Sequence, residues 1–330
     1  MARARRVLSG LVAVGVSVLL IGLMPSSAVA EETVAFTIKD PRIDQSSGLA
    51  RDVAAGLYWT ANGAGASGVA YGLTATGVVR GTLNYRPKPV DVKAVALVAD
   101  RLYVGDIGDN AHTRKFVRVY RFSRPRATGL TVTYRAYDFA YPDGSHDAET
   151  LLVNETGQIF IVTKGNKGAI YAGPKQASRV GLNQLEKVGS APAKITDGTF
   201  LPGSKQIALR THSAVYLVDA NTYKVVASAE VQPQPQGESL AVSLDGNSLL
   251  LGSAGKQSKV YAIPVPTELA ASPSPSATPS TTAEPSDPGD NPDVSNDNAG
   301  ESRKGTFLAL GLAALVAVVA GVVVGVIRRP

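Results

Sequence analysis

The chain has 330 residues, no cysteine and a formal net charge of +6. The lack of cysteine excludes disulfides, thiol catalysis and Cys-based metal sites, so a folded domain here must rely on its hydrophobic core. The basic residues are scattered and form no stripe interleaved with aromatic residues, so we expect no nucleic-acid binding.

The first 30 residues are predicted to be a signal peptide. Three arginines within the first six residues precede an apolar run over residues 8–24, and Ala28-Val29-Ala30 supplies the small residues that a signal peptidase recognises. Glu31 would then begin the mature chain. The alternative, an uncleaved membrane anchor, fits less well because Pro25-Ser26-Ser27 closes the apolar run with polar residues.

Residues 31–266 are expected to form one all-β domain. Five times along this segment, a short apolar strand is followed by a turn and a second apolar strand. The matching apolar positions are 40 to 56 residues apart and comprise Leu49, Val95, Leu151, Phe200 and Leu240. Four-stranded blades of a β-propeller repeat with about this period, so we predict a propeller with five blades. Six blades would result if the longest interval, from Val95 to Leu151, held two units. A β-sandwich is the alternative fold.

The ring is predicted to be closed by a strand near the N-terminus. The fourth unit has four clear strand segments, at residues 195–201, 206–211, 214–218 and 223–231. The fifth unit lacks its last strand, whereas residues 33–38 form a strand that belongs to no unit. Placing this strand on the outside of the fifth blade would close the ring and remove an exposed edge.

Three polar motifs stand out in this domain. They are RLYVGDIGDN at residues 101–110, with Arg114 after it, YPDGSHDAE at residues 141–149, and QPQGE at residues 234–238. These motifs resemble the signatures of a family of exported actinobacterial β-propeller proteins, and the resemblance covers almost all of the domain. It implies the propeller fold and export without implying an activity. Family members commonly have an acid where this chain has Lys93 and an Asn-Asp-Ser-Gly turn where it has residues 62–65.

Carboxylates recur where the predicted units begin, and in a propeller these positions lie near one mouth of the central channel. Calcium binds six to eight oxygen ligands, which converging loops can supply. The candidate metal ligands are Asp91, Asp106, Asp109, Asp147, Glu149 and Glu238. The candidate ligand-binding residues are Asp106, Asp109, Asn110, Arg114, His146, Asp147, Glu149 and Glu238. In the competing interpretation, Glu149 or Glu238 pairs with Lys93 or Arg114, and Asp109-Asn110 stabilises a turn.

No catalytic residue is assigned from the sequence. The chain has no nucleophile-elbow motif, and His112, His146 and His212 carry no local catalytic signature. We therefore expect a binding or scaffold module for a ligand or protein partner of the cell envelope. A metal-assisted hydrolase of the esterase, lactonase or phosphatase type, with its site at one mouth of the channel, is the alternative.

The C-terminal part is predicted to be a stalk followed by a membrane anchor. Residues 267–302 are rich in Pro, Ser, Thr and Asp, a composition that cannot bury enough apolar surface to fold. In the last segment, 303–330, residues 306–327 carry no charge and are long enough to span a bilayer. Arg328 and Arg329 follow directly, so the C-terminus is expected in the cytoplasm and the folded domain outside the cell membrane.

Overall fold

The computed structural model describes residues 30–63, 65, 67–234 and 236–267. The predicted signal peptide, apart from its last residue, nearly all of the predicted stalk and the predicted membrane anchor lie outside this part of the chain. Within the described residues, the regular elements are β-strands. None of these residues belongs to a helix long and apolar enough to cross a membrane.

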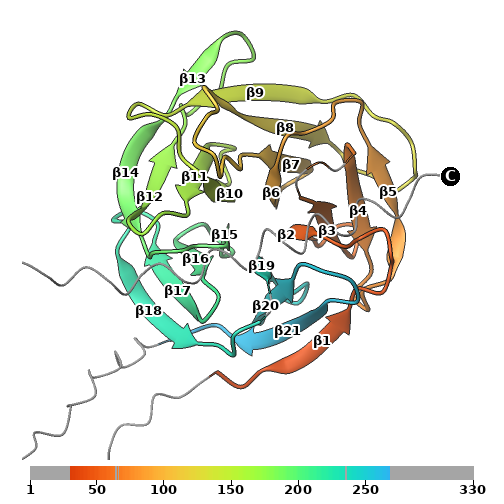
Figure 1. Cartoon of the computed structure of the whole chain (residues 1–330). Coiled ribbons are helices and arrows are strands. Elements are labelled where there is room, and N and C mark those ends of the chain that lie inside the picture. The colour runs from red at the N-terminus through yellow and green to blue at the C-terminus, as the bar shows by residue number, and fades with distance from the viewer. Residues whose placement is uncertain (1–29, 64, 66, 235, 268–330) are drawn as a thin grey trace, which may run out of the picture. The chain divides into compact units, whose positions relative to one another are not determined.

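Five sheets are arranged around a central axis (Figure 1). Blade 1 contains β2 (Ser46–Asp52), β3 (Leu57–Asn62), β4 (Val69–Leu73) and β5 (Val79–Asn84). Blade 2 contains β6 (Val92–Val98), β7 (Arg101–Asp106), β8 (Val117–Ser123) and β9 (Arg135–Ala140). Blade 3 contains β10 (Ala148–Val153), β11 (Ile159–Thr163), β12 (Gly168–Ala172) and β14 (Glu186–Ala191).

The last two blades complete the circle. Blade 4 contains β15 (Asp197–Phe200), β16 (Gln206–Arg210), β17 (Ala214–Asp219) and β18 (Val225–Glu230). Blade 5 contains β19 (Gly237–Val242), β20 (Ser248–Ser253), β21 (Lys259–Pro264) and β1 (Thr33–Thr37). The five-bladed propeller predicted from the repeat is confirmed. The long interval between Val95 and Leu151 holds one blade, and its extra length lies in the loops at residues 107–116 and 124–134.

The inner strands define the central axis. In the order β2, β6, β10, β15 and β19, each contacts the next, and β19 contacts β2. A pocket of about 220 Å³ is lined by the later residues of all five inner strands. These strands therefore run in the same direction, and their first residues lie together at the other end of the axis.

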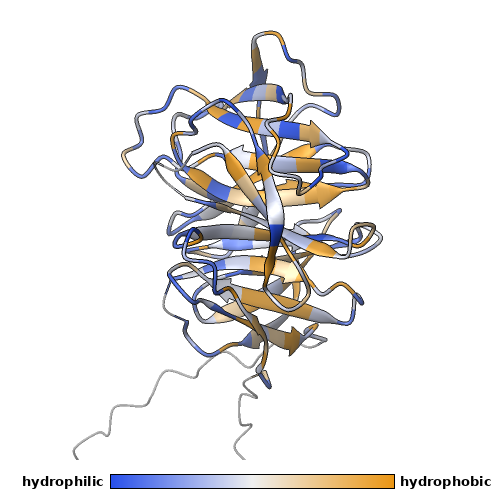
Figure 2. Cartoon of the chain, turned by 90° about the vertical axis from the view of Figure 1, so that its right-hand side faces the viewer, coloured by the Kyte–Doolittle hydropathy of each residue, from blue (hydrophilic) through white to orange (hydrophobic). Residues whose placement is uncertain are grey.

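The core is divided among the spaces between blades. Each of the five apolar clusters is formed by side chains from two neighbouring blades, such as Trp59 of blade 1 with Leu102 of blade 2. The side view shows apolar stretches on strands throughout the domain, beside strands that are partly polar (Figure 2). Burial of both sheet faces explains why β10 is buried at every residue and why β11, with the sequence IFIVT, is apolar over four successive residues.

Strand β1 contacts both blade 5 and blade 1. It pairs antiparallel with β21, and the backbone N–H of Ile38 donates to the carbonyl of Ser258 at 2.9 Å. Its buried side chain Phe36 stacks on Tyr58 of blade 1, with ring centroids 5.6 Å apart. Figure 1 shows β1 on the outside of blade 5, far from β2 along the radius of the ring.

The short strand β13 (Leu182–Gln184) was not predicted from the sequence. The chain leaves blade 3 after β12, adds β13 in parallel to β9 of blade 2, and returns to blade 3 as β14. Asn183 holds this excursion in place, since its amide donates to the carbonyls of Asp138 and Ser178 at 3.0 and 2.9 Å. Blade 2 consequently has five strands, and blades 2 and 3 share a segment.

Candidate functional site

Three inner strands begin with a β-bulge whose extra residue is charged. The pairing of β6 with β7 skips Lys93, that of β10 with β11 skips Glu149, and that of β19 with β20 skips Glu238. A bulged residue leaves the regular alternation of the strand, which lets its side chain take a new direction. These three charges occupy equivalent positions in three blades, at the end of the axis where the inner strands start.

Lys93 links two carboxylates at this end. Its Nζ lies 3.5 Å from Asp91 Oδ2 and 3.4 Å from Glu149 Oε1, and the Nζ of Lys164 lies 2.8 Å from the same Glu149 oxygen. The Glu149 side chain is fully buried, and this burial raises its pKa although both lysines oppose the change. Burial alone would lower the pKa of Lys93, but the charges of Glu149 and Asp91 raise it. Lys93 is thus a cation held between acids.

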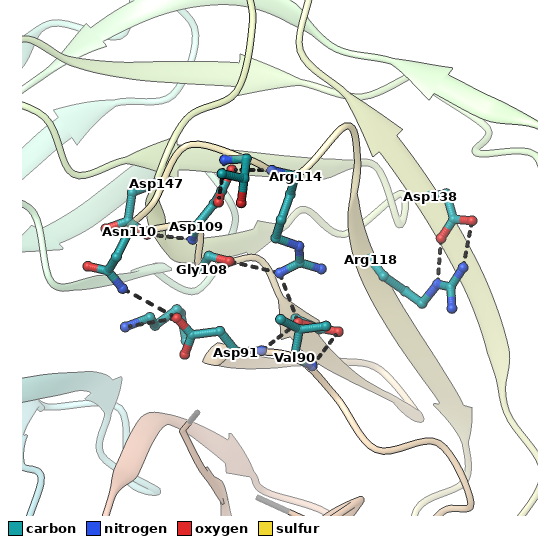
Figure 3. A network of polar contacts seen from close by, with 12 residues as sticks. Val90, Asp91, Gly108, Asp109, Asn110, Arg114, Arg118, Asp138 and Asp147 are labelled. Carbon is teal, nitrogen blue, oxygen red and sulfur yellow. Dashed lines mark hydrogen bonds and ion pairs between the residues drawn. The ribbon is translucent and has the colours of Figure 1, made fainter. Parts of the chain in front are cut away.

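Asp106 accepts hydrogen bonds from a second basic residue, Arg114, and from two backbone N–H groups. Its Oδ1 accepts hydrogen bonds from Arg114 Nη1 at 3.0 Å and from the N–H of Asp91 at 2.9 Å, and its Oδ2 accepts from the N–H of Val90 at 3.1 Å. The same Arg114 nitrogen donates to the carbonyl of Gly108 at 2.8 Å (Figure 3). Asp106 therefore fixes the start of β6 against the loop that follows β7.

Asp109 organises that loop and joins it to blade 3. Its carboxylate accepts the backbone N–H groups of Thr113 and Arg114, each at 2.9 Å. Its own N–H donates to Asp147 Oδ1 at 2.7 Å, and Asn110 reaches Asp91 at 3.5 Å (Figure 3). The turn role predicted as an alternative for Asp109 is present, because these bonds close the loop.

Two buried carboxylate oxygens in this network have no hydrogen-bond partner among the described residues. They are Asp91 Oδ1 and Glu149 Oε2, and both carboxylates contact Lys93 through their other oxygen. Burial also raises the pKa of Asp91. Unpaired buried acceptors are unfavourable in a folded protein and are found where a ligand or another donor completes the site.

The six predicted acids do not form a metal cage in the described part of the chain. No group of three or more His, Asp or Glu side chains there is placed to hold a metal ion. Asp91, Asp106 and Glu149 instead face Lys93, Lys164 and Arg114. The geometry favours internal pairing over the calcium interpretation.

The remaining predicted residues differ in their surroundings. Glu238 is half-buried, and its negative charge helps to raise the pKa of Lys93 and of Lys164. It forms no hydrogen bond or ion pair with either lysine in the described structure. His146 belongs to a separate group: its Nε2 lies 2.9 Å from Asp143 Oδ1 and 3.1 Å from the Tyr171 hydroxyl. The nearby hydroxyl of Ser145 donates to the carbonyl of His112, so it is not bonded to an imidazole.

Lys164 is the site residue that sequence reasoning missed. It follows β11, the second strand of blade 3, as residues 107–110 follow the second strand of blade 2. The blade repeat could therefore have predicted that Lys164 lies at this end of the axis, although a single lysine in a turn belongs to no chemical motif.

Comparison with protein-family models and with curated proteins gives no match. The functional argument therefore rests on the geometry of the fold and of its charged groups.

We expect Lys93→Met to destabilise the domain by about 2 kcal/mol at pH 7. Removing one partner of a buried pair costs about 3–5 kcal/mol, and here Lys164 still neutralises part of the Glu149 charge. Burial holds the pKa of Glu149 above that of an unfolded chain, so protonation favours the folded state, and the loss should shrink as the pH falls through that pKa.

Urea melts of Lys93→Met, Glu149→Gln and the double variant at pH 7 and pH 5 would measure this coupling. If the two single effects simply add, Lys93 and Glu149 do not interact and the network is not a unit.

Proposed function

We propose that the protein is a binding or scaffold module whose ligand binds at the charged end of the inner-strand ring, outside the cell membrane. The five-bladed propeller supports this function because the fold brings residues of several blades to one end of an axis. Fold alone does not specify a ligand, so the chemistry of the site carries the rest of the proposal.

The proposal is carried by two buried acceptors, Asp91 Oδ1 and Glu149 Oε2, which have no hydrogen-bond partner among the described residues. A ligand that donates hydrogen bonds, such as an amine or a polyol, would satisfy both oxygens. Carboxylates outnumber basic groups among the residues predicted for this site, which favours a neutral or cationic ligand. The metal-assisted hydrolase is less well supported, because the described acids are not arranged as a metal cage.

The proposed location rests on the predicted signal peptide, the predicted stalk and the predicted C-terminal membrane anchor. Protease added to intact cells should release a fragment that contains the propeller, since the stalk would be accessible from outside. Complete protection of the propeller in intact cells, together with its digestion after lysis, would contradict this topology.

The ligand class can be tested with a small set of probes. We expect an amine such as spermidine, or a polyol such as inositol, to raise the melting temperature of the wild-type chain, because a ligand that binds only the folded state stabilises it. Calcium chloride is the probe for the metal interpretation.

Glu149→Gln should abolish the shift. Glu155→Gln is the matched control, since Glu155 lies on the turn after β10, at the opposite end of the same strand. A shift that both variants retain would place the ligand elsewhere.

A further inference from the structure

A cleft lies between strands β7, β8 and β9 of blade 2 and the turn that joins β10 to β11 in blade 3. Its volume is about 210 Å³, and it is lined by four basic side chains, Arg101, Arg121, Arg135 and Lys175. We call it the basic cleft. A second pocket of about 490 Å³ shares Arg121 and Arg135 and adds Arg179. None of the described residues that line either pocket is acidic.

The pairing of β8 with β9 places two arginines directly opposite each other. Arg121 is the cross-strand partner of Arg135, and on its other side it faces Tyr103 of β7. Like charges in such positions repel and weaken a sheet. The repulsion between Arg121 and Arg135 therefore lowers the stability of the sheet, and an anion bound between them would remove it.

The described chain provides almost no counter-ion for this cleft. Asp138 is close in sequence to Arg135, but it points to the other side of β9, where both of its oxygens bind Arg118 (Figure 3). Asp100 lies 3.8 Å from Arg101 Nε, and both side chains are about half exposed, so their attraction is weak. Arg121, Arg135 and Lys175 have no ion pair among the described residues.

Arg121 is held in place by a hydrogen bond to the Tyr103 side chain, and one of its nitrogens still lacks an acceptor among the described residues. Its guanidinium carbon lies 5.5 Å from the centroid of the Tyr137 ring, and its buried Nε has no hydrogen-bond partner in the described structure. Gly157, in the left-handed region at φ 86°, faces the same space. A Cβ on it would lie 3.6 Å from the Tyr103 hydroxyl and 3.8 Å from Arg101 Nη1. The cleft therefore contains a buried hydrogen-bond donor, Arg121 Nε, that no described residue satisfies.

We propose that the basic cleft binds a phosphate group, with Arg121 and Arg135 donating to its oxygens and Arg101 and Lys175 supplying further positive charge. Planar guanidinium groups match two oxygens of a phosphate at once, which a single ammonium group cannot do. A phosphate carries up to two charges and more acceptors than a carboxylate, which suits a site with four cations. The phosphate can belong to a soluble phosphomonoester or to the headgroup of an anionic lipid.

This site is distinct from the charged end of the inner-strand ring. Arg101 begins β7, whereas Asp106 ends it. The cleft therefore lies at the opposite ends of the blade 2 strands, and the two proposals can fail independently.

Binding of inorganic phosphate to the full chain, measured by isothermal titration at constant ionic strength, tests the proposal. The variant Arg135→Gln/Lys175→Gln replaces two exposed residues, so the fold should be retained. We expect its dissociation constant for phosphate to rise at least tenfold, because one charge-assisted hydrogen bond and one further positive charge are lost. Arg80→Gln/Lys187→Gln makes the same charge change at exposed positions of β5 and β14 and should leave the constant unchanged.

Vesicles distinguish the two sources of phosphate. Cosedimentation with phosphatidylglycerol vesicles that is absent from phosphatidylcholine vesicles, and is lost in Arg135→Gln/Lys175→Gln, would assign the cleft to a lipid headgroup. Phosphate binding without vesicle binding would assign it to a soluble phosphate compound. The proposal is overturned if wild type binds neither probe, or if the cleft variant and the control variant lose binding equally.

Discussion

Deletion of residues 31–39 is expected to abolish cooperative folding of the propeller. Strand β1 supplies the outer edge of blade 5 and buries Phe36 and Ile38 in the cluster shared with blade 1. Without it, β21 would expose an unpaired edge, and the space between the first and last blades would lose its cover. Because each blade is supported by two neighbours, opening one junction should weaken the whole ring.

Circular dichroism and urea melts of the deleted chain would show this loss, and a smaller change resolves the contribution of the strand itself. Phe36→Ala should cost about 3–5 kcal/mol because it removes a buried aromatic ring. Val34→Ala, on the same strand but 52% exposed, should change stability by less than about 0.5 kcal/mol. A deleted chain that still melts cooperatively near the wild-type temperature would show that β1 does not close the ring.

The substitution Arg210→Met is expected to cost about 3–5 kcal/mol, the range for removing one member of a buried charged network. Arg210 is fully buried in blade 4 and reaches across to blade 5. Its Nη1 donates to the carbonyls of Ser239 and Gly252 at 2.7 and 2.6 Å, and its Nη2 donates to Gln234 Oε1 at 3.0 Å. Methionine fills part of the space but leaves all three acceptors without this donor.

The pH dependence of this loss has a defined sign. Burial raises the pKa of Asp197, which lies across the strand pair from Arg210. Protonation of Asp197 therefore favours the folded state, and the variant, which lacks the nearby positive charge, should recover stability as the pH falls.

Urea melts at pH 7 and pH 5 would measure this recovery. Arg118→Met is the control, since its pair with Asp138 is partly exposed to solvent and should contribute only about 1 kcal/mol. Equal losses in the two variants would mean that the contacts between blades 4 and 5 do not depend on Arg210.

The sequence predicted the repeat well because propeller blades place local signals close together. In the fourth unit, the expected segments at residues 206–211 and 214–218 match β16 and β17 to within one residue. Apolar runs separated by turns of two or three residues can form few other structures. Strand β13 was missed because it is short, mostly polar and paired with a strand more than 40 residues away.

The candidate site was predicted less completely than the fold. Positions at the starts of the inner strands followed from the repeat, and Asp91, Lys93 and Glu149 do meet there. Which partner each acid takes depends on side-chain directions set by the bulges, and the bulges leave no mark in composition or periodicity. The basic cleft was not predicted either, since its arginines come from three strands and only Arg101 lies in one of the polar motifs.

The bulges at Lys93, Glu149 and Glu238 also determine which side chains of the ring end can change without altering the strand pairing. A bulged residue stands outside the register of its strand pair, so exchanging its side chain leaves the ladder on either side intact. Sign reversal at one of these positions would change the ligand preference of the ring end while the blades keep their pairing. The backbone pairing of the blades therefore tolerates a new side chain at these three positions, although at Lys93 the loss of the contact with Glu149 still costs stability.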